Sequence, residues 1–334
     1  MSQPEPGVPP APARAVARAP GHWGEWMQGR IGENGPVALI TLPCPALSLS
    51  AEARPGPLSA AVEIAAPPGD ASAPGAPPAV FVPMQAGEAA PVLRALLSAL
   101  SLPEASFRFR APMPPGAGAG FSTAALVAAA RAAAALHGRE APGPGALAAA
   151  CLAAEGASDP LWAPAPDALL WASRKAQALE VLPPPPPAEI IGGLWGAPEA
   201  TNPADDRFPD ISDLVGPWRA AAGAGDLPAL ARLAAASADR CTALRGPSGD
   251  PTADLARALG ALGHARAHTG PARGLVFAPG TVPDGAGDAL RAAGFERVFR
   301  FTSGSAAGRP AAPMGDADDA PDDAPGAATP GPRA

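Results

Sequence analysis

The sequence predicts an α+β fold, because short strand patterns and longer helix patterns are interleaved along its 334 residues. The stretch 106–136 shows this interleaving clearly. Phe107 and Phe109 alternate with arginines as in a half-buried strand, three prolines end that strand, and a glycine-rich loop leads into an alanine-rich helix over 124–136. With 47% hydrophobic residues, the chain can bury one large core or two modest ones.

The region before this stretch is expected to hold four strands and one helix. Pro43 and Pro45 divide an apolar region into two strands. Further apolar runs predict two short strands, and a helical spacing of leucines predicts the helix. The expected strands are 37–42, 46–51, 62–64 and 80–82, and the expected helix is 91–102.

The region after it begins with a predicted helix at 146–154 and an ambiguous segment at 168–181, which forms either one helix or two short strands. Five consecutive prolines, residues 183–187, predict a stiff spacer and the seam between two domains. Beyond the seam the expected strands are 189–195, 274–278 and 295–302, and the expected helices are 220–238, 252–262 and 288–294.

Composition narrows the classes of function. A net charge of −7 and a pI near 5.1 argue against binding of nucleic acid or of an anionic membrane, so we expect a small-molecule substrate. Cys44, Cys151 and Cys241 have no metal-ligand spacing and indicate a reducing compartment without disulfides. Residues 1–20 are expected to be a disordered leader, because prolines and Glu5 interrupt the apolar core that a secretion signal needs. We therefore expect a cytoplasmic protein, with a disordered acidic Pro/Ala tail at 303–334.

The glycine-rich loop is the first candidate site. Gly116, Gly118 and Gly120 leave its backbone bare of side chains, and Ser122 and Thr123 stand where the following helix is expected to be capped. Unpaired N–H groups and the positive end of the helix dipole meet at such a junction, which suits a phosphate group. A plain structural turn is the alternative.

Two further groups of polar residues are candidates. Glu25 and Gln28 lie in the glycine-bounded block 21–29, where a bare backbone can approach a ligand, although a tight turn with solvated side chains fits the same residues. Glu155 and Asp159 follow the end of a predicted helix. Two carboxylates there can hold a metal ion or take a proton, or they can be solvated charges in a turn.

The loop sequence PPGAGAGFSTAALVAAA resembles the phosphate loop of the GHMP small-molecule kinases. More narrowly, the chain resembles the L-threonine kinases of cobalamin side-chain assembly, the propanediol-utilisation type. Four blocks match that group in order. They are 21–29 with the apolar stretch after it, 106–130, Glu155 with a nearby aspartate, and 263–270 followed by 274–277.

The resemblance implies a ribosomal S5 domain 2-like ATP-binding domain at 21–182 and a ferredoxin-like domain at 183–302. It implies ATP and Mg²⁺ as cofactors, phosphoryl transfer to a hydroxyl of L-threonine or a similar hydroxylated amino acid, and a monomer or homodimer. By position, it makes Asp159 the catalytic residue, which orients or deprotonates the acceptor alcohol, and Ser122 and Glu155 the Mg²⁺ ligands. ATP contacts are implied for Gly116, Gly118, Gly120, Ser122 and Thr123, and positions near the acceptor or the phosphates for Glu25, Gln28, His268, Thr269 and Gly270.

The chain departs from that group at three places. Phe121 stands where the group has serine, Ala117 replaces a loop lysine, and Ser158 occupies the expected position of the acid, so that Asp159 is one residue late. These departures favour a second hypothesis, a weakened paralogue that binds a nucleotide or metabolite without turnover. A nicotinamide-dependent oxidoreductase is a third hypothesis, disfavoured because Phe121 stands where the dinucleotide fingerprint requires glycine and because Glu140 follows no strand.

Overall fold

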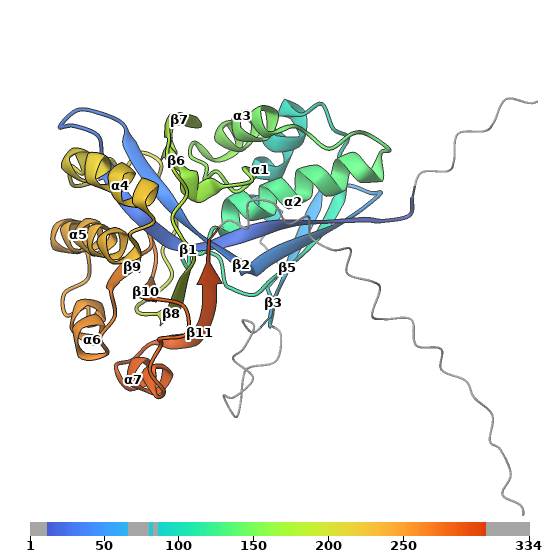
Figure 1. The fold of residues 1–334 in the computed structure, drawn as a ribbon. Coiled ribbons are helices and arrows are strands. Elements are labelled where there is room, and N and C mark those ends of the chain that lie inside the picture. Colours follow the sequence, from blue (N-terminus) through green and yellow to red (C-terminus); the bar gives the residue numbers. More distant parts are fainter. Residues whose placement is uncertain (1–11, 66–79, 83–85, 305–334) are drawn as a thin grey trace, which may run out of the picture.

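The structure, a computed structural model, describes residues 12–65, 80–82 and 86–304. One mixed sheet organises it, with the strand order β11-β8-β10-β9-β1-β2-β5-β3-β4, and β6 and β7 branch from β2 (Figure 1). The strands are β1 (Ala15–Arg30), β2 (Val37–Arg54), β3 (Ser59–Ile64), β4 (Val80–Val82), β5 (Ser106–Ala111), β6 (Leu169–Ala172), β7 (Gln177–Val181), β8 (Ala188–Leu194), β9 (Gly263–Arg266), β10 (Ala272–Phe277) and β11 (Glu296–Ser303).

Helices cover the two halves of this sheet. They are α1 (Ala86–Ala99), α2 (Phe121–Leu136), α3 (Pro144–Glu155), α4 (Ser212–Ala224), α5 (Leu227–Arg245), α6 (Thr252–Ala258) and α7 (Ala286–Ala292), with a short 3₁₀ turn, η1 (Pro166–Ala168). Helices α1 to α3 gather over one half, and α4 to α7 surround the other (Figure 1). The long strands β1 and β2 run through the middle, where α2 and α5 both contact β1.

Strand β1 corrects two predictions. It starts at Ala15, so residues 15–20 are not part of a disordered leader, and residues 1–11 lie outside the described residues. The block 21–29 is likewise a strand rather than a tight turn. It is an irregular strand, since its register with β2 shifts between Ala19 and Gly21, between His22 and Glu25, and again before Met27. Such bulges re-aim side chains and occur frequently beside active sites.

Strand β2 is continuous through Pro43 and Pro45, so the two predicted strands are one. A proline disrupts a ladder because it has no N–H to donate, and it is tolerated at a bulge. Here Pro43 lies opposite His22, whose own N–H donates to the carbonyl of Ala119 in the glycine loop at 3.3 Å. The bulge in β1 therefore removes the need for a ladder bond at Pro43.

Helix α2 begins three residues earlier than predicted and is buried along nearly its whole length. Its alanines allow this, because a helix with small side chains can pack closely against the sheet and against α1 and α3. The predicted cap by Ser122 or Thr123 is wrong. The residue before the helix is Gly120, in the left-handed region at φ 71°, and no side chain caps it.

The ambiguous segment 168–181 forms two short strands, β6 and β7, which is one of the two alternatives that the sequence left open. The region after the proline run contains three corrections. The predicted helix 220–238 is two helices, α4 and α5, because Gly225 ends the first in the left-handed region and the Asp226 side chain caps the second. Strand β9, just before the second small-residue turn, was not predicted as a strand, and β11 extends to Ser303, the first residue of the predicted tail.

The predicted seam at 183–187 lies between β7 and β8. Residues on both sides of it belong to one buried cluster, including Leu182 and Ala188, and strands from both sides join one sheet. At the centre of that sheet β1 and β9 are joined by one residue pair, Glu25 opposite Arg266. The division into domains at residue 183 stays a prediction.

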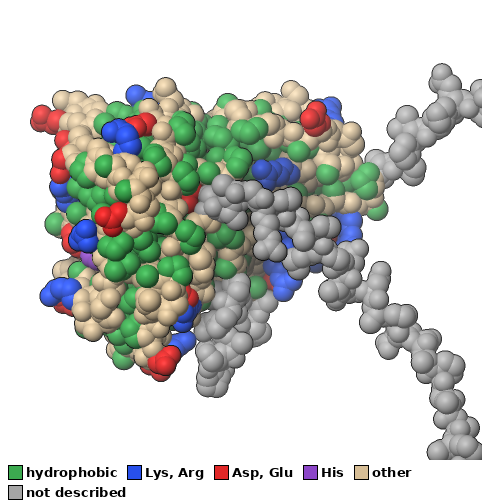
Figure 2. Space-filling view, in the orientation of Figure 1, with side chains coloured by type: hydrophobic (Ala, Val, Ile, Leu, Met, Phe, Trp, Pro, Cys, Tyr) green, Lys and Arg blue, Asp and Glu red, His purple; other side chains and the backbone are tan. Residues whose placement is uncertain are grey.

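The surface carries both basic and acidic side chains. On the face shown in Figure 2, basic and acidic side chains are interspersed over the helical part of the molecule. In the described part of the chain, no helix combines the length and the apolar character needed to cross a membrane. The three cysteines are buried and unbridged.

Candidate active site

A cavity of about 330 Å³ lies where the glycine loop, β1, the segment after α3 and the loops around 200 and 268 meet. Ten of the residues proposed from the sequence line it. They are Glu25, Gly116, Gly118, Gly120, Ser122, Thr123, Glu155, Asp159, His268 and Thr269. Segments far apart in the sequence are thus brought together at one place.

The glycine loop requires its glycines. Gly116, Gly118 and Gly120 have φ values of 75°, 78° and 71°, in the left-handed region that other residues rarely adopt. A Cβ on Gly118 would lie 2.2 Å from the Cβ of Ala267, and one on Gly120 would lie 2.2 Å from Cδ2 of His22. The loop is therefore packed tightly against β1 on one side and the turn after β9 on the other.

The loop is held by its carbonyl groups. Backbone N–H groups of neighbouring segments donate to them: Gly24 to Gly118 at 3.1 Å, Ala272 to Ala117 at 3.0 Å, and Glu199 to Gly116 at 2.9 Å. The N–H of Ala117 donates to Pro114. Within the described part of the chain, the N–H groups of residues 118–123 have no hydrogen-bond acceptor. These amides and the N-terminus of α2 are therefore available to an anion, the kind of ligand that the sequence predicts for this loop.

Ser122 and Glu155 form a second element of the site. The Ser122 hydroxyl donates a hydrogen bond to Oε1 of Glu155 across the cavity. Burial raises the pKa of Glu155 to about 8, and the nearby charge of Asp159 adds to this rise. A hydroxyl and a carboxylate are oxygen ligands of the kind that Mg²⁺ prefers, and a bound cation would favour the ionised carboxylate.

Asp159 reaches the cavity from the segment after α3. Its backbone N–H donates to the Thr123 hydroxyl at 3.2 Å, and its side chain is 25% exposed. Burial alone would raise the pKa of this carboxyl, but the hydrogen bond and charge of His22 outweigh burial and hold the pKa below its usual value. The carbonyl of the buried Ser158 beside it accepts a hydrogen bond from the indole N–H of Trp171 at 2.7 Å. The aspartate, although one residue late, is therefore the acid that faces the site.

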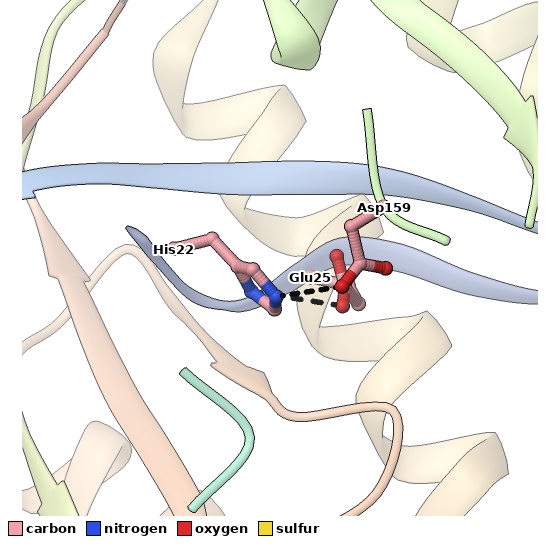
Figure 3. A group of neighbouring side chains, drawn as sticks. All are labelled: His22, Glu25 and Asp159. Carbon is pink, nitrogen blue, oxygen red and sulfur yellow. Dashed lines mark hydrogen bonds and ion pairs between the residues drawn. The ribbon is translucent and has the colours of Figure 1, made fainter. Parts of the chain in front are cut away.

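His22 and Glu25 project from the bulged part of β1 toward Asp159 (Figure 3). Nε2 of His22 lies 3.3 Å from Oδ2 of Asp159, and Nδ1 lies 3.8 Å from Oε1 of Glu25. Burial lowers the pKa of His22, but the neighbouring Glu25 and Asp159 more than offset this and raise it to about 9. Burial raises the pKa of Glu25 to about 8 against the charge of His22. The sequence hypotheses missed His22, although its place between Gly21 and Gly24 was a signal.

The remaining predicted residues differ in position. His268 lines the cavity and stacks on Phe208 with 4.1 Å between ring centroids, and burial together with the charge of Arg174 lowers its pKa to about 3. The Thr269 hydroxyl lies 2.7 Å from that of Thr201. The loop after β9 thus covers one side of the cavity.

Gln28 and Gly270 do not line the cavity. The Gln28 side-chain amide donates to the carbonyl of Arg266 at 2.9 Å, and its carbonyl accepts from Cys241, so it joins β1 to β9 and α5. Gly270 lies beneath the glycine loop, where a Cβ would be 2.4 Å from the carbonyl oxygen of Gly116. Both residues support the site from behind.

Phe121 does not fill the cavity. It is partly buried, packs against the cluster between the sheet and α1, and borders both the main cavity and a smaller hollow of about 140 Å³. That hollow is lined largely by apolar residues, among them Val92, Leu93, Phe109 and Leu126.

No family model matches the sequence, and no curated protein matches it. Solved structures do match. The chain is similar to a mevalonate kinase of L. major in complex with R-mevalonate, with a TM-score of 0.58 and 14% identity over 89% of this chain and 97% of the other. It is similar to a homoserine kinase from Cytophaga hutchinsonii, with a TM-score of 0.58 and 17% identity over 90% and 98%. A third structure, titled MDDEF in complex with MVAPP, AMPPCP and magnesium, has a TM-score of 0.55 and 12% identity over 88% and 98%.

The chain has the GHMP kinase fold. This confirms the predicted fold class, a mixed α and β architecture with a curled sheet. The fold also counts against the oxidoreductase hypothesis, because dinucleotide binding of that kind belongs to a mostly parallel sheet. Among the strands that the structure describes, β3 and β5 pair in parallel and the other pairs are antiparallel.

Proposed function

We propose that the protein is an ATP-dependent kinase that transfers the γ-phosphoryl group to a hydroxyl of a small metabolite. The observation that carries this proposal is the convergence on one cavity of unused loop amides, a hydroxyl–carboxylate pair and a partly exposed aspartate. Phosphoryl transfer needs these three elements, because catalysis of this reaction consists mainly of positioning and of neutralising charge.

The amides of residues 118–123 would hold the phosphate oxygens at the N-terminus of α2. Ser122 and Glu155 would hold Mg²⁺, which neutralises the charge on the phosphates when bound. The apolar hollow beside Phe121 adjoins the main cavity, since Ser122 and Glu155 line both. Its apolar lining suits the nucleotide base. Phe121 would then pack beside the base instead of blocking the phosphates.

Asp159 would accept the proton of the acceptor hydroxyl. The pKa of Asp159 is lowered, so its carboxylate is ionised, and the side chain is partly exposed to the cavity. Its backbone N–H donates to the hydroxyl of Thr123, the third residue of α2, which fixes its position. A base that is anchored to the same helix as the phosphate loop keeps a fixed distance from the phosphates, which in-line transfer requires.

For the acceptor we propose L-threonine or a similar hydroxylated amino acid or amino alcohol, used for cobalamin side-chain synthesis. The sequence blocks shared with the L-threonine kinases support this class. The similarity in fold to a homoserine kinase and a mevalonate kinase is compatible with it, since their names describe alcohol acceptors. A cytoplasmic monomer or homodimer without nucleic-acid or membrane partners belongs to the same proposal.

The test is to incubate the purified chain with Mg-ATP and a panel of hydroxylated amino acids, amino alcohols and other small alcohols. ADP release and a phosphorylated product detected by ³¹P NMR are expected with at least one of them. The Asp159→Asn variant is the matched control, expected to bind ATP and to lose turnover by two orders of magnitude or more, roughly the contribution of a general base.

The second candidate function is binding of nucleotide without turnover, which the loss of the loop lysine at Ala117 favours. ATP binding measured by calorimetry separates the two. Binding without ADP release on any acceptor would establish the second function and overturn the first, and absence of ATP binding would overturn both.

A further inference from the structure

His22 has no role in the transfer described so far, yet its ring contacts two ionisable groups of the site. Nδ1 lies 3.1 Å from the Gly24 carbonyl oxygen and 3.8 Å from Oε1 of Glu25. Nε2 lies 3.3 Å from Oδ2 of Asp159. Both nitrogens therefore face acceptors, and an imidazole can donate at both positions only when it carries both protons.

The ring is also fixed in place mechanically. The N–H of His22 donates to the carbonyl of Ala119, and a Cβ on Gly120 would lie 2.2 Å from Cδ2 of the ring. His22 is 4% exposed, so its position is set by the glycine loop on one face and by β1 on the other. A displacement of the ring would require a displacement of the loop that holds the phosphates.

His22 is a suitable cation for a site that holds few others. No arginine or lysine is among the described residues that line the cavity. The other lining histidine, His268, is kept neutral because its pKa is lowered to about 3. The charged groups facing His22 are Glu25 from its own strand and Asp159 from the segment after α3. The chain's single lysine, Lys175, is exposed on the turn between β6 and β7.

The geometry points to His22 as a positioning residue, a buried cation held by Gly24 and Glu25 that orients the Asp159 carboxylate toward the acceptor hydroxyl. This inference rests on the proposed function for its kinetic part, but the charge and contacts of His22 stand without it. Oδ2 of Asp159, bonded to the ring, is fixed, which leaves the other carboxylate oxygen for the proton of the acceptor. When Glu25 is ionised, its carboxylate, 3.8 Å from Nδ1, favours the charged form of the ring.

A shared metal ion is the competing explanation, because one ligand atom each of His22, Glu25 and Asp159 lies within 4.8 Å of the others. The hydrogen bonds of the ring favour a cation. Nδ1 lies 3.1 Å from the Gly24 carbonyl oxygen and Nε2 lies 3.3 Å from Oδ2 of Asp159. A doubly protonated ring donates to both acceptors, whereas a metal ion on Nε2 would replace the hydrogen bond to Asp159.

The first experiment measures the charge of His22 directly, by NMR titration of the histidine Cε1–H resonances in the full chain with EDTA present. The signal is assigned by its loss in His22→Gln. We expect the His22 signal to remain that of a protonated ring above pH 8 and to titrate with a midpoint near pH 9. In Glu25→Gln we expect this midpoint to fall by about one pH unit or more. His264→Gln is the control, since His264 lies on β9 and pairs with Asp239 of α5, and its loss should leave the His22 midpoint unchanged. A His22 midpoint at or below pH 6.5 would overturn the inference. A change of the His22 signal when EDTA is replaced by equimolar Zn²⁺ would also overturn it, because the ring would then bind a metal ion and not a proton.

The second experiment measures positioning. His22→Gln keeps a hydrogen-bond donor and removes the charge, whereas His22→Lys keeps the charge. We expect kcat to fall about tenfold or more in the glutamine variant with KM for ATP within about twofold, the acid limb of the kcat profile to move to higher pH, and the lysine variant to recover most of the loss. An unchanged kcat and pH profile in His22→Gln would refute the positioning role. If the wild type phosphorylates nothing, the kinase proposal fails by itself, and the NMR titration still decides the state of His22.

Discussion

Replacing Gly120 by alanine tests the packing of the glycine loop against His22. Gly120 has φ 71°, and an alanine in the left-handed region costs on the order of 1 kcal/mol. The added Cβ would also lie 2.2 Å from Cδ2 and 2.8 Å from Nε2 of His22 and 2.9 Å from Cδ1 of Leu161. Relieving contacts this short requires the ring or the loop to move by about 1 Å, and overpacking of this kind costs roughly 1–3 kcal/mol.

We therefore expect Gly120→Ala to lose about 2–4 kcal/mol of unfolding free energy, measured by urea denaturation, and about a hundredfold in turnover, since a misplacement of about 1 Å has that effect. Gly138→Ala is the matched control. Gly138 follows the same helix, has φ 61°, and has no atom within 4 Å of an added Cβ, so it reports the backbone cost alone. Equal losses of stability in the two variants would show that His22 does not press on the loop.

Three further outcomes are expected. His22 and Glu25 bind their protons more tightly in the folded protein than in the unfolded chain, with pKa values raised to about 9 and about 8. The unfolding free energy should therefore fall by about 4–5 kcal/mol for the two groups together between pH 6.5 and 9 in urea titrations, and a flat profile would contradict this. Asp250→Ala removes the carboxylate 2.7 Å from the buried Arg273 guanidinium and leaves that charge without its partner. The unfolding free energy should fall by about 3–5 kcal/mol in the same assay, and a loss below about 1 kcal/mol would show that Arg273 does not depend on Asp250 for compensation of its charge. Ser122→Ala should raise the Mg²⁺ concentration needed for half-maximal turnover about tenfold with little change in melting temperature, and an unaltered Mg²⁺ dependence would exclude Ser122 as a ligand.

Local sequence patterns predicted the fold where one strong signal was present. The alternating Phe107 and Phe109 marked β5, and the alanine run marked α2. Patterns failed where tertiary contacts decided the outcome. Pro43 lies inside a strand because the opposite strand bulges there, and α4 and α5 are separate helices because Gly225 adopts a left-handed conformation that the surrounding alanines concealed.

The candidate site was predicted through its residue types more than through its geometry. Glycines before a helix and acids after one were enough to propose the loop, Glu155 and Asp159, and the structure places them on one cavity. Gln28 was misjudged, because a polar residue between glycines gives no sign of whether its amide meets a ligand or the carbonyl of Arg266. His22 was missed because its importance lies in contacts with Asp159, more than a hundred residues away.

The way the glycine loop is supported has a consequence for how the chain assembles. Ala117 receives a hydrogen bond from Ala272, Gly116 receives one from Glu199, and Gly270 fits beneath Gly116 only because it has no side chain. A fragment ending within the proline run would contain the whole loop and lack every one of these supports. Such a fragment should capture nucleotide poorly when produced by itself and regain capture when the complementary piece, residues 188–304, is supplied separately, so that the two pieces reassemble before either can hold a ligand.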